Sequence, residues 1–534
     1  MDTDTLIKQQ SVDSSTACAA ALENASPGSL IRIAPGIYRE PIEINCSGTA
    51  EQPIRIEAEE GGTVVFNGAV PVEDWVFESD GIWVTDFVVT AEQNWVEGYK
   101  HLGLPIQVWV GEARLEIVEL FDELVANSFC YQDGKLRIKL PAGRDPREEV
   151  IEVAREATMV TINGSHIEFS GCYITRCAAT VQVGGLCLNG AHCVIEDCEF
   201  SEAAGGIGAH LDGNDATIRG NRFHHNGQMG FGMVAANCLF EGNQIDHNDL
   251  RNFCSNPKND MHVWECGGGK VAYARNCVFR NNRFTDNLRG PALWFDIDNY
   301  RNRIDGNYFS NNGHSSIMIE ISRDNVICNN IICDTLESNY SSSGILIQLS
   351  CKTRIYHNLF LRSEGYGVHL RWHHRTRDIH PYEPEDPDAF EKTHGFRQED
   401  WMAPDGQYPT SDNDIRNNIF IDCRRGAIRV DPVSEFMEGN QSDYNFFWNQ
   451  HNLHPMDGGH QLGEWQAMTG LDANSYCEKM VHFGPLLENA TMEGVRYDPE
   501  GPIPCYKVPR IEEVCVDING KAFSEMTQTG PFSD

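Results

Sequence analysis

A repeated six-residue pattern between residues 190 and 425 constrains the fold more than any other feature of the chain. Each copy begins with an apolar residue, carries a polar residue near its centre and ends with an aromatic or aliphatic one. The copies read IEDCEF, IRGNRF, FEGNQI, FRNNRF, IDGNYF, ICNNII, IYHNLF and IRNNIF. We mark them at Asp197, Asn221, Asn243, Asn282, Asn307, Asn329, Asn358 and Asn418. Most successive marks lie 22 to 29 residues apart, and gaps of 39 and 60 residues indicate insertions.

The pattern predicts an all-β protein whose main body is a right-handed parallel β-helix. Units of this length contain short strand-like runs, and they lack the 10–15-residue amphipathic helices that a globular α/β fold would place between parallel strands. Asn suits the marked positions because it tolerates left-handed turns and its amide can hydrogen-bond to the equivalent residue on the next coil. We therefore place the main β-helix at residues 157–435, with insertions at 249–269 and 373–412.

The regions on either side of the repeat have their own character. Residues 1–71 contain a predicted helix at Thr16–Asn24 followed by short strands, which is how a solenoid covers its open end. Residues 72–156 have longer alternating runs and turn signals at Gly111–Glu112 and Asp133–Gly134, which predict an inserted antiparallel β-domain. Residues 436–534 lose the repeat, and we expect this irregular segment to pack along the helix.

Composition narrows the classes of partner and compartment. The 534 residues include 42 Lys and Arg against 78 Asp and Glu, a net charge of -36, which disfavours nucleic acid and anionic membranes as partners. The N-terminus has no basic and apolar leader, and no stretch is long and apolar enough to cross a membrane. The 19 cysteines form no CxxC pair and sit in apolar runs, which favours buried free thiols in a reducing compartment. We expect a cytoplasmic protein without cofactor, as a monomer or a homo-oligomer.

Two acidic residues form the candidate catalytic pair. In the predicted strands 292–298 and 316–322, apolar residues alternate with outward-facing ones, and each strand presents one central carboxylate, Asp296 or Glu320. Asp296 follows Asn282 by 14 residues and Glu320 follows Asn307 by 13, so the two acids should occupy equivalent positions on adjacent coils. Stacked coils would bring them to about 5 Å, the separation that retaining glycosidases use. The alternative is that both carboxylates only solvate an exposed face.

Other polar and aromatic residues extend the candidate site. Asp298 is a weaker acidic candidate on the same face, and five polar residues continue that face on later coils: Gln348, His369, Arg371, Arg429 and Asp431. The first insertion ends in WECGGGK, which supplies the candidates Trp264, Glu265 and Lys270, and Trp294 could stack on a sugar ring. The histidines of the second insertion lack the spacing of a metal site, so we expect no metal.

The order WECGGGK, LWFDID and IMIEIS after an inserted β-domain resembles β-helical glycoside hydrolases, and the resemblance is greatest to glycoside hydrolase family 120, the β-xylosidases. It covers about residues 28–335 and fades beyond. The resemblance implies that Asp296 is the nucleophile and Glu320 the general acid/base, and that Glu265 and Lys270 contact the sugar. The implied activity is the hydrolysis of short oligosaccharides.

Two other functions remain open from the sequence. A polysaccharide lyase or epimerase on the same scaffold would need a base such as Lys270, Arg371 or His373. A non-catalytic carbohydrate-binding β-helix would need neither acid of the pair. The sugar, its linkage and the anomeric configuration are not encoded in any motif.

Overall fold

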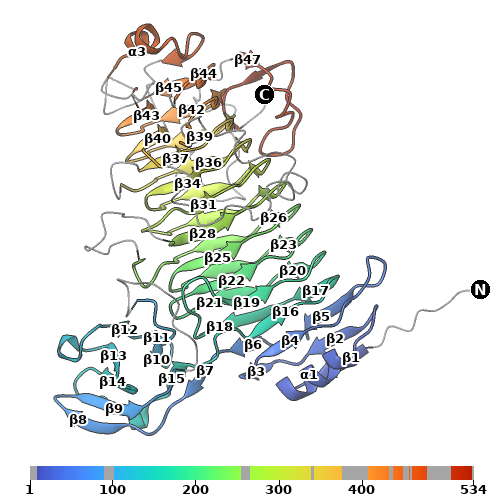
Figure 1. The fold of residues 1–534 in the computed structure, drawn as a ribbon, viewed down its shortest axis with the longest axis vertical. Coiled ribbons are helices and arrows are strands. Elements are labelled where there is room, and N and C mark those ends of the chain that lie inside the picture. The colour runs from blue at the N-terminus through green and yellow to red at the C-terminus, as the bar shows by residue number, and fades with distance from the viewer. Residues whose placement is uncertain are drawn as a thin grey trace, which may run out of the picture. The chain divides into compact units, whose positions relative to one another are not determined.

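The computed structural model describes residues 9–89, 102–253, 265–337, 342–375, 407–431, 437–448, 456, 460–477 and 507–531. The chain divides into two compact units, Met1–Lys270 and Val271–Asp534, which we describe separately. In both units, successive strands join three parallel sheets in turn, so that three strands make one coil (Figure 1). The predicted all-β class and parallel β-helix are confirmed.

The first unit contains the opening coils. Its sheet A consists of β1 (Gln9–Val12), β2 (Leu30–Ile33), β5 (Ile54–Ala58), β17 (Ile167–Ser170), β20 (Val194–Glu196), β23 (Thr217–Arg219) and β26 (Leu239–Glu241). Its sheet B consists of β3 (Gly36–Tyr38), β6 (Val64–Asn67), β18 (Cys172–Thr175), β21 (Glu199–Ser201), β24 (Arg222–His224) and β27 (Gln244–Asp246). Its sheet C consists of β4 (Ile42–Ile44), β16 (Val160–Ile162), β19 (Gly184–Leu188), β22 (Ile207–Leu211), β25 (Met229–Met233) and β28 (Gly267–Ala272), which ends at the unit boundary.

Helix α1 (Ser15–Glu23) covers the open end of these coils (Figure 1). The Ser14 hydroxyl accepts a hydrogen bond from the Ala17 N–H at 3.2 Å, which begins the helix. Cys18, Ala21 and Leu22 are buried on the side that faces the strands. The helix therefore shields strand edges and apolar side chains that would otherwise face water.

The inserted domain leaves sheet B after β6 and returns before β16. Its strands are β7 (Ala69–Pro71), β8 (Val76–Ser79), β9 (Ile82–Asp86), β10 (Val108–Val110), β11 (Ala113–Arg114), β12 (Glu116–Ile117), β13 (Ser128–Gln132), β14 (Lys135–Lys139) and β15 (Ile151–Ala154), with short 3-10 turns at Phe121–Glu123 and Pro146–Glu148. They form a four-stranded and a five-stranded sheet in which all pairs but β12–β13 are antiparallel. Both predicted turns join hairpin strands, with positive φ at Gly111 (61°) and Gly134 (74°).

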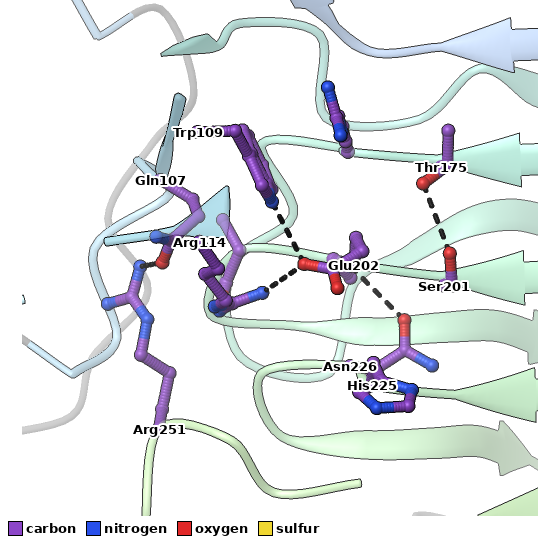
Figure 2. A network of polar contacts seen from close by, with 12 residues as sticks. Gln107, Trp109, Arg114, Thr175, Ser201, Glu202, His225, Asn226 and Arg251 are labelled. Carbon is purple, nitrogen blue, oxygen red and sulfur yellow. Dashed lines mark hydrogen bonds and ion pairs between the residues drawn. The ribbon is translucent and has the colours of Figure 1, made fainter. Parts of the chain in front are cut away.

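A polar network anchors the inserted domain to the coils of the first unit (Figure 2). Glu202, which follows β21, accepts hydrogen bonds from Trp109 Nε1 at 2.9 Å and Arg114 Nη1 at 3.0 Å. Arg251, which is buried and follows strand β27, donates to the backbone carbonyl of Leu102 in the inserted domain at 3.1 Å. The contact therefore pairs the carboxylate of Glu202 with Arg114 and satisfies the buried Arg251 with a backbone carbonyl of the inserted domain.

The second unit continues the same plan. Its sheet A consists of β29 (Val278–Arg280), β32 (Arg303–Asp305), β35 (Val326–Cys328), β38 (Arg354–Tyr356), β41 (Asp414–Arg416) and β44 (Gln441–Asp443). Its sheet B consists of β30 (Arg283–Thr285), β33 (Tyr308–Ser310), β36 (Ile331–Cys333), β39 (Leu359–Leu361), β42 (Ile419–Ile421), β45 (Phe446–Trp448) and β46 (Tyr476–Cys477). Its sheet C consists of β31 (Leu293–Asp296), β34 (Ser315–Glu320), β37 (Ser343–Gln348), β40 (Tyr366–Arg371) and β43 (Gly426–Val430).

Asparagine ladders join the coils internally, as the repeat predicts. Asn282 Nδ2 donates to Asn307 Oδ1 at 2.9 Å, and Asn307 Nδ2 donates to Asn330 Oδ1 at 3.0 Å. The ladder continues through Asn358, Asn418 and Asn445. Each amide also satisfies backbone groups of the turn, so these fully buried polar side chains are stabilising.

Two of the marks placed from the sequence are wrong by one residue. The ladder residue in ICNNII is Asn330, whereas Asn329 has a φ of +56°. In IEDCEF the equivalent position is Cys198, whose N–H donates to Asn221 Oδ1, whereas Asp197 has a φ of +53°. The residue with left-handed backbone therefore precedes the ladder residue. Two different residues make the turn and form the hydrogen-bonded ladder.

The segment 507–531 packs on sheets A and B of the second unit. It contains β47 (Lys507–Pro509) and β48 (Met526–Gln528), while α3 (Leu462–Thr469) precedes it in the chain. Val514 and Phe523 pack in an apolar cluster with Val326 and Tyr356. No helix in the described ranges is long and apolar enough to cross a membrane.

The cysteines are mostly buried free thiols, as expected from their apolar surroundings. Cys266 is the exception, because it is disulfide-bonded. Scattered cysteines with irregular spacing cannot reveal such a pairing in advance.

Candidate active site

Asp296 and Glu320 are direct neighbours in sheet C of the second unit. Strands β31 and β34 are parallel, and their register pairs Asp296 with Glu320 and Phe295 with Ile319. In-register residues of adjacent parallel strands lie about 4.8 Å apart, and alternation sends both carboxylates to the same face. The strands end at the two acids, earlier than the predicted ends at residues 298 and 322.

The outward face of sheet C carries two columns of side chains across the coils. The column of the acids continues from Glu320 to Gln348 and then to Arg371 in unbroken register. The neighbouring column consists of Trp294, Met318, Leu346, His369 and Arg429. An apolar platform therefore flanks a polar ladder, and the predicted residues Trp294, Gln348, His369 and Arg371 share the face of the acids.

This face is buried, so the expectation that the two acids lie on an exposed surface is wrong. Asp296 and Glu320 are each only 5% exposed. Of the described side chains from outside the coil, Arg375 contacts Glu320, while Trp372 and Tyr408 pack in an apolar cluster just beyond the ends of the strands. Two carboxylates held side by side in such a place are costly, which excludes the interpretation that they merely solvate the surface.

Two donors within the described ranges bind Glu320. Gln348 Nε2 and Arg375 Nη1 each donate to Glu320 Oε1 at 2.8 Å, and Arg371 Nη1 donates to Gln348 Oε1 at 2.7 Å. Both bonds to Glu320 fall on one oxygen, so they fix the orientation of the carboxyl plane. Sequence reasoning missed Arg375, because only the path of the chain beyond β40 brings it back over β34.

Asp298 does not continue the column of the acids. Ile297 and Asp298 have left-handed φ values of +55° and +52°, which end the alternation after Asp296. Burial raises the pKa of Asp298 to about 7; the charge of Arg323 opposes this rise, and that of Asp296 adds to it. At neutral pH this side chain therefore exists in both protonation states.

His369 forms a buried dyad with Asp431. His369 Nε2 lies 3.1 Å from Asp431 Oδ1, which also accepts a hydrogen bond from Arg429 Nε at 3.0 Å. Burial lowers the pKa of His369, with Arg429 and Arg371 acting in the same direction and Asp431 against them. Burial alone would raise the pKa of Asp431. The hydrogen bonds and electrostatic attraction of His369 and Arg429 outweigh burial, so the pKa of Asp431 lies below its usual value. The dyad is thus a neutral imidazole beside an ionised carboxylate.

The first unit holds the predicted pair Glu265 and Lys270. Lys270 Nζ contacts Glu265 Oε2 directly, and Gln182 Nε2 donates to the same oxygen at 2.9 Å. Gln228 Nε2 donates to the Glu265 carbonyl at 2.5 Å, while Glu265 itself has a φ of +44°. Sequence reasoning missed both glutamines, which no local motif distinguishes.

Packing explains two of the three consecutive glycines before Lys270. Gly267 has a φ of +116°, a region that favours glycine. A Cβ atom at Gly269 would lie 2.2 Å from the ring of Phe231. Backbone conformation therefore accounts for Gly267, and packing inside the coil accounts for Gly269.

Some predicted residues cannot be placed. Trp264 lies outside the described residues, as do most of the two insertions. Within the described parts of the chain, no three His, Cys, Asp or Glu side chains are grouped so as to hold a metal ion.

Comparisons with known proteins agree with the fold. The family described as a right handed beta helix region matches residues 148–266, a periplasmic copper-binding protein family (NosD) matches 241–381, and chondroitinase B matches 12–86. No curated protein matches the chain by sequence. The donor set of the described residues does not fit a copper ion, so we assign none.

Solved structures give a likeness over nearly the whole length. XylC, in a structure with xylose, has a TM-score of 0.65 at 14% identity and covers 96% of this chain and 94% of its own. A mannuronic acid specific polysaccharide family 6 lyase from human gut microbiota has a TM-score of 0.49 at 11% identity, covering 89% and 92%. The likeness to XylC agrees with the predicted resemblance at the level of the fold.

Proposed function

We propose that the protein is a retaining glycoside hydrolase that acts on short oligosaccharides. The single observation behind this proposal is the in-register, buried pair Asp296 and Glu320. Carboxyl groups about 5 Å apart suit attack and proton transfer at one glycosidic bond, whereas inverting enzymes need about 6.5–9.5 Å. Like charges directly opposite each other on neighbouring strands are destabilising, so a pair without a function would be costly to keep.

In the proposed first step, Asp296 attacks the anomeric carbon while Glu320 gives its proton to the leaving oxygen. The bond from carbon to the Asp296 oxygen forms as the glycosidic bond breaks, and the shortened sugar leaves as an alcohol. In the second step, Glu320 takes a proton from water, whose oxygen displaces Asp296. Arg375 stabilises the carboxylate form of Glu320 that this second step requires.

The substrate is proposed to be β-xyloside-like. The sequence resemblance and the fold shared with XylC both favour this class, and the described site supplies hydroxyl-binding groups at Gln348 and Arg371. Trp294 lies one column from the acids, where an indole can stack on a sugar ring. The proposed reaction uses no metal or cofactor.

Neutralising either acid tests the proposal. Asp296→Asn and Glu320→Gln should each lower kcat/KM on aryl glycosides by at least about 1,000-fold, because each removes a group that acts in the transition state. The matched control is Asp286→Asn. Asp286 lies in the same unit, directly after strand β30 of sheet B, and its carboxylate accepts a hydrogen bond from Asn311. Folded variants that hydrolyse the panel as fast as wild type would refute the assignment.

A lyase or epimerase on this scaffold is the second candidate, and one observation favours it. Burial, with help from Arg371 and Arg375, lowers the pKa of His373 to about 4, which leaves a neutral imidazole beside two guanidinium groups. A base and cations to neutralise a uronate are what that chemistry requires. Ultraviolet absorbance from an unsaturated product, without a new reducing sugar from water attack, would select this candidate. Sugar binding that survives loss of both acids, with no product, would indicate a binding protein.

A further inference from the structure

The outward face of β40 carries polar groups at a distance from the catalytic pair. His369 and Arg371 lie on β40, which is two strands beyond β34 in sheet C. Two strand spacings put them about 10 Å from Glu320 along the ladder. Carboxyl groups that flank one bond are only about 5 Å apart, so a ligand contact on β40 reaches a different sugar unit.

Asp431 determines which nitrogen of His369 carries the proton. An ionised carboxylate can only accept, so the contact between His369 Nε2 and Asp431 Oδ1 makes Nε2 the donor. Arg429 holds Asp431 from the other side through its Nε. The neutral ring therefore presents a lone pair at Nδ1, in an orientation set by Asp431.

That lone pair is buried. His369 is 1% exposed, and its Nδ1 makes no hydrogen bond with any residue in the described ranges. Leaving a buried acceptor without a donor is destabilising. The nearby His373 likewise has a buried Nδ1 without a hydrogen bond among the described residues. The buried lone pair of His369 and the buried ring nitrogen of His373 therefore mark a place that can receive the polar groups of a ligand.

The chemistry of the lining distinguishes between possible ligands. Arg371 supplies N–H donors, whereas His369 Nδ1 supplies an acceptor lone pair. A carboxylate would face that lone pair with its own negative charge, which is repulsive. A sugar hydroxyl both donates and accepts, so it can satisfy the imidazole and the guanidinium together.

We propose that His369, Arg371 and His373 form a second subsite for a neutral, hydroxyl-rich sugar unit next to the cleaved bond. The inference rests on the proposed function in placing the cleaved bond at Asp296 and Glu320. Asp431 is a positioning residue of this subsite, because it acts through His369. The preferred substrate is then an uncharged disaccharide or longer oligosaccharide, and a simple monoglycoside lacks one of the contacts.

Binding by the Asp296→Asn protein tests the subsite without hydrolysis. Calorimetry would compare xylobiose with xylose, and cellobiose with glucose. We expect a disaccharide to bind at least tenfold more tightly than its monosaccharide, and His369→Leu to remove most of that gain. The matched control is His225→Leu, a histidine of the first unit whose pKa burial also lowers. No gain, or a gain that His369→Leu leaves intact, would overturn the subsite.

Kinetics separate this inference from the proposed function. In otherwise wild-type protein, His369→Leu should lower the ratio of kcat/KM for xylobiose to that for 4-nitrophenyl β-xyloside at least tenfold. An equal loss on both substrates would show a structural role and refute the subsite. If a disaccharide binds as expected but is never hydrolysed, the hydrolase proposal fails and the subsite stands. Tighter binding of a glucuronosyl-xylose disaccharide than of xylobiose would overturn the neutral-sugar assignment.

Discussion

Asp298 lies two residues beyond Asp296 in the chain but in left-handed backbone, and only 7% of it is exposed. Because Ile297 adopts the same backbone region, the side chain of Asp298 leaves the column that the two catalytic candidates share. Its environment favours the protonated acid, with burial as the largest cause. A single turn residue thus separates a buried acid that titrates near neutral pH from the proposed catalytic pair.

This environment predicts a pH-dependent effect of Asp298→Asn. The pKa of Asp298 is about 7 in the folded protein, and an unfolded Asp has a pKa near 3.9. Between these values the folded state binds more protons, so this residue lowers the free energy of unfolding as pH rises, by up to about 4 kcal/mol at pH 8. The amide cannot ionise, so Asp298→Asn escapes this loss. We therefore expect the free energy of unfolding of Asp298→Asn, relative to that of wild type, to increase from pH 4.5 to pH 8.

Urea midpoints at the two pH values measure this effect. Asp324→Asn, which alters a partly exposed carboxylate of the same unit, serves as the control. If the urea midpoints of Asp298→Asn and wild type change equally between the two pH values, Asp298 ionises in the folded protein as readily as in the unfolded chain.

At the scale of elements, the buried asparagine ladder joins one coil to the next. Asn307 accepts from the N–H and the Nδ2 of Asn282, and it donates to Asn330 Oδ1 and the Phe279 carbonyl. All of these groups are buried in the turn between sheets A and B. Replacing the amide leaves several donors and acceptors unsatisfied at once.

Asn307→Leu should therefore lower the free energy of unfolding by about 3 kcal/mol or more, although the side chains are similar in size. Asn45→Leu is a matched control, because Asn45 accepts a similar bond from Asn163 at 2.8 Å at an exposed position. We expect a change within about 0.5 kcal/mol for the control. Equal shifts of the urea midpoint would show that the buried ladder contributes no more than a surface contact.

The pair of strands β31 and β34 was predictable because two local signals agree. Alternation with period two predicted the face of the strand on which each acid lies. The sequence separations from Asn282 and Asn307 predicted that the two acids occupy equivalent positions on adjacent coils. The burial of that face was not predictable, because it depends on chain from outside the coil. For the same reason the sequence did not reveal Arg375 against Glu320 or Asp431 against His369: both contacts join residues more than 50 positions apart through insertions of irregular length.

The turn positions were the other source of error. Asn329 and Asn330 are chemically identical, and only the backbone distinguishes the left-handed residue from the ladder residue. The end of strand β31 is similar, since nothing in WFDID marks the point at which alternation stops. Boundaries are set by turn geometry, whereas the repeat reports only the existence and order of the strands.

At the scale of the whole molecule, the stacking of coils turns sequence-distant residues into neighbours at a fixed spacing. Every β-helix carries such columns, but this one places two buried acids side by side and pairs Glu320 with Arg375. The fold shared with XylC supplies the scaffold, and the columns on sheet C of the second unit supply the proposed chemistry. In the proposed hydrolysis, the spacing of about 4.8 Å between strands, rather than any single residue, would set the stereochemical outcome.

The anomeric configuration of the first-formed product tests this central claim most directly. Proton NMR would follow an aryl β-glycoside that the protein hydrolyses, before the free sugar mutarotates. Attack by Asp296 and then by water gives two inversions, so the account predicts that the β-anomer appears first. Initial appearance of the α-anomer would mean a single displacement by water, which two acids in direct register are too close to perform.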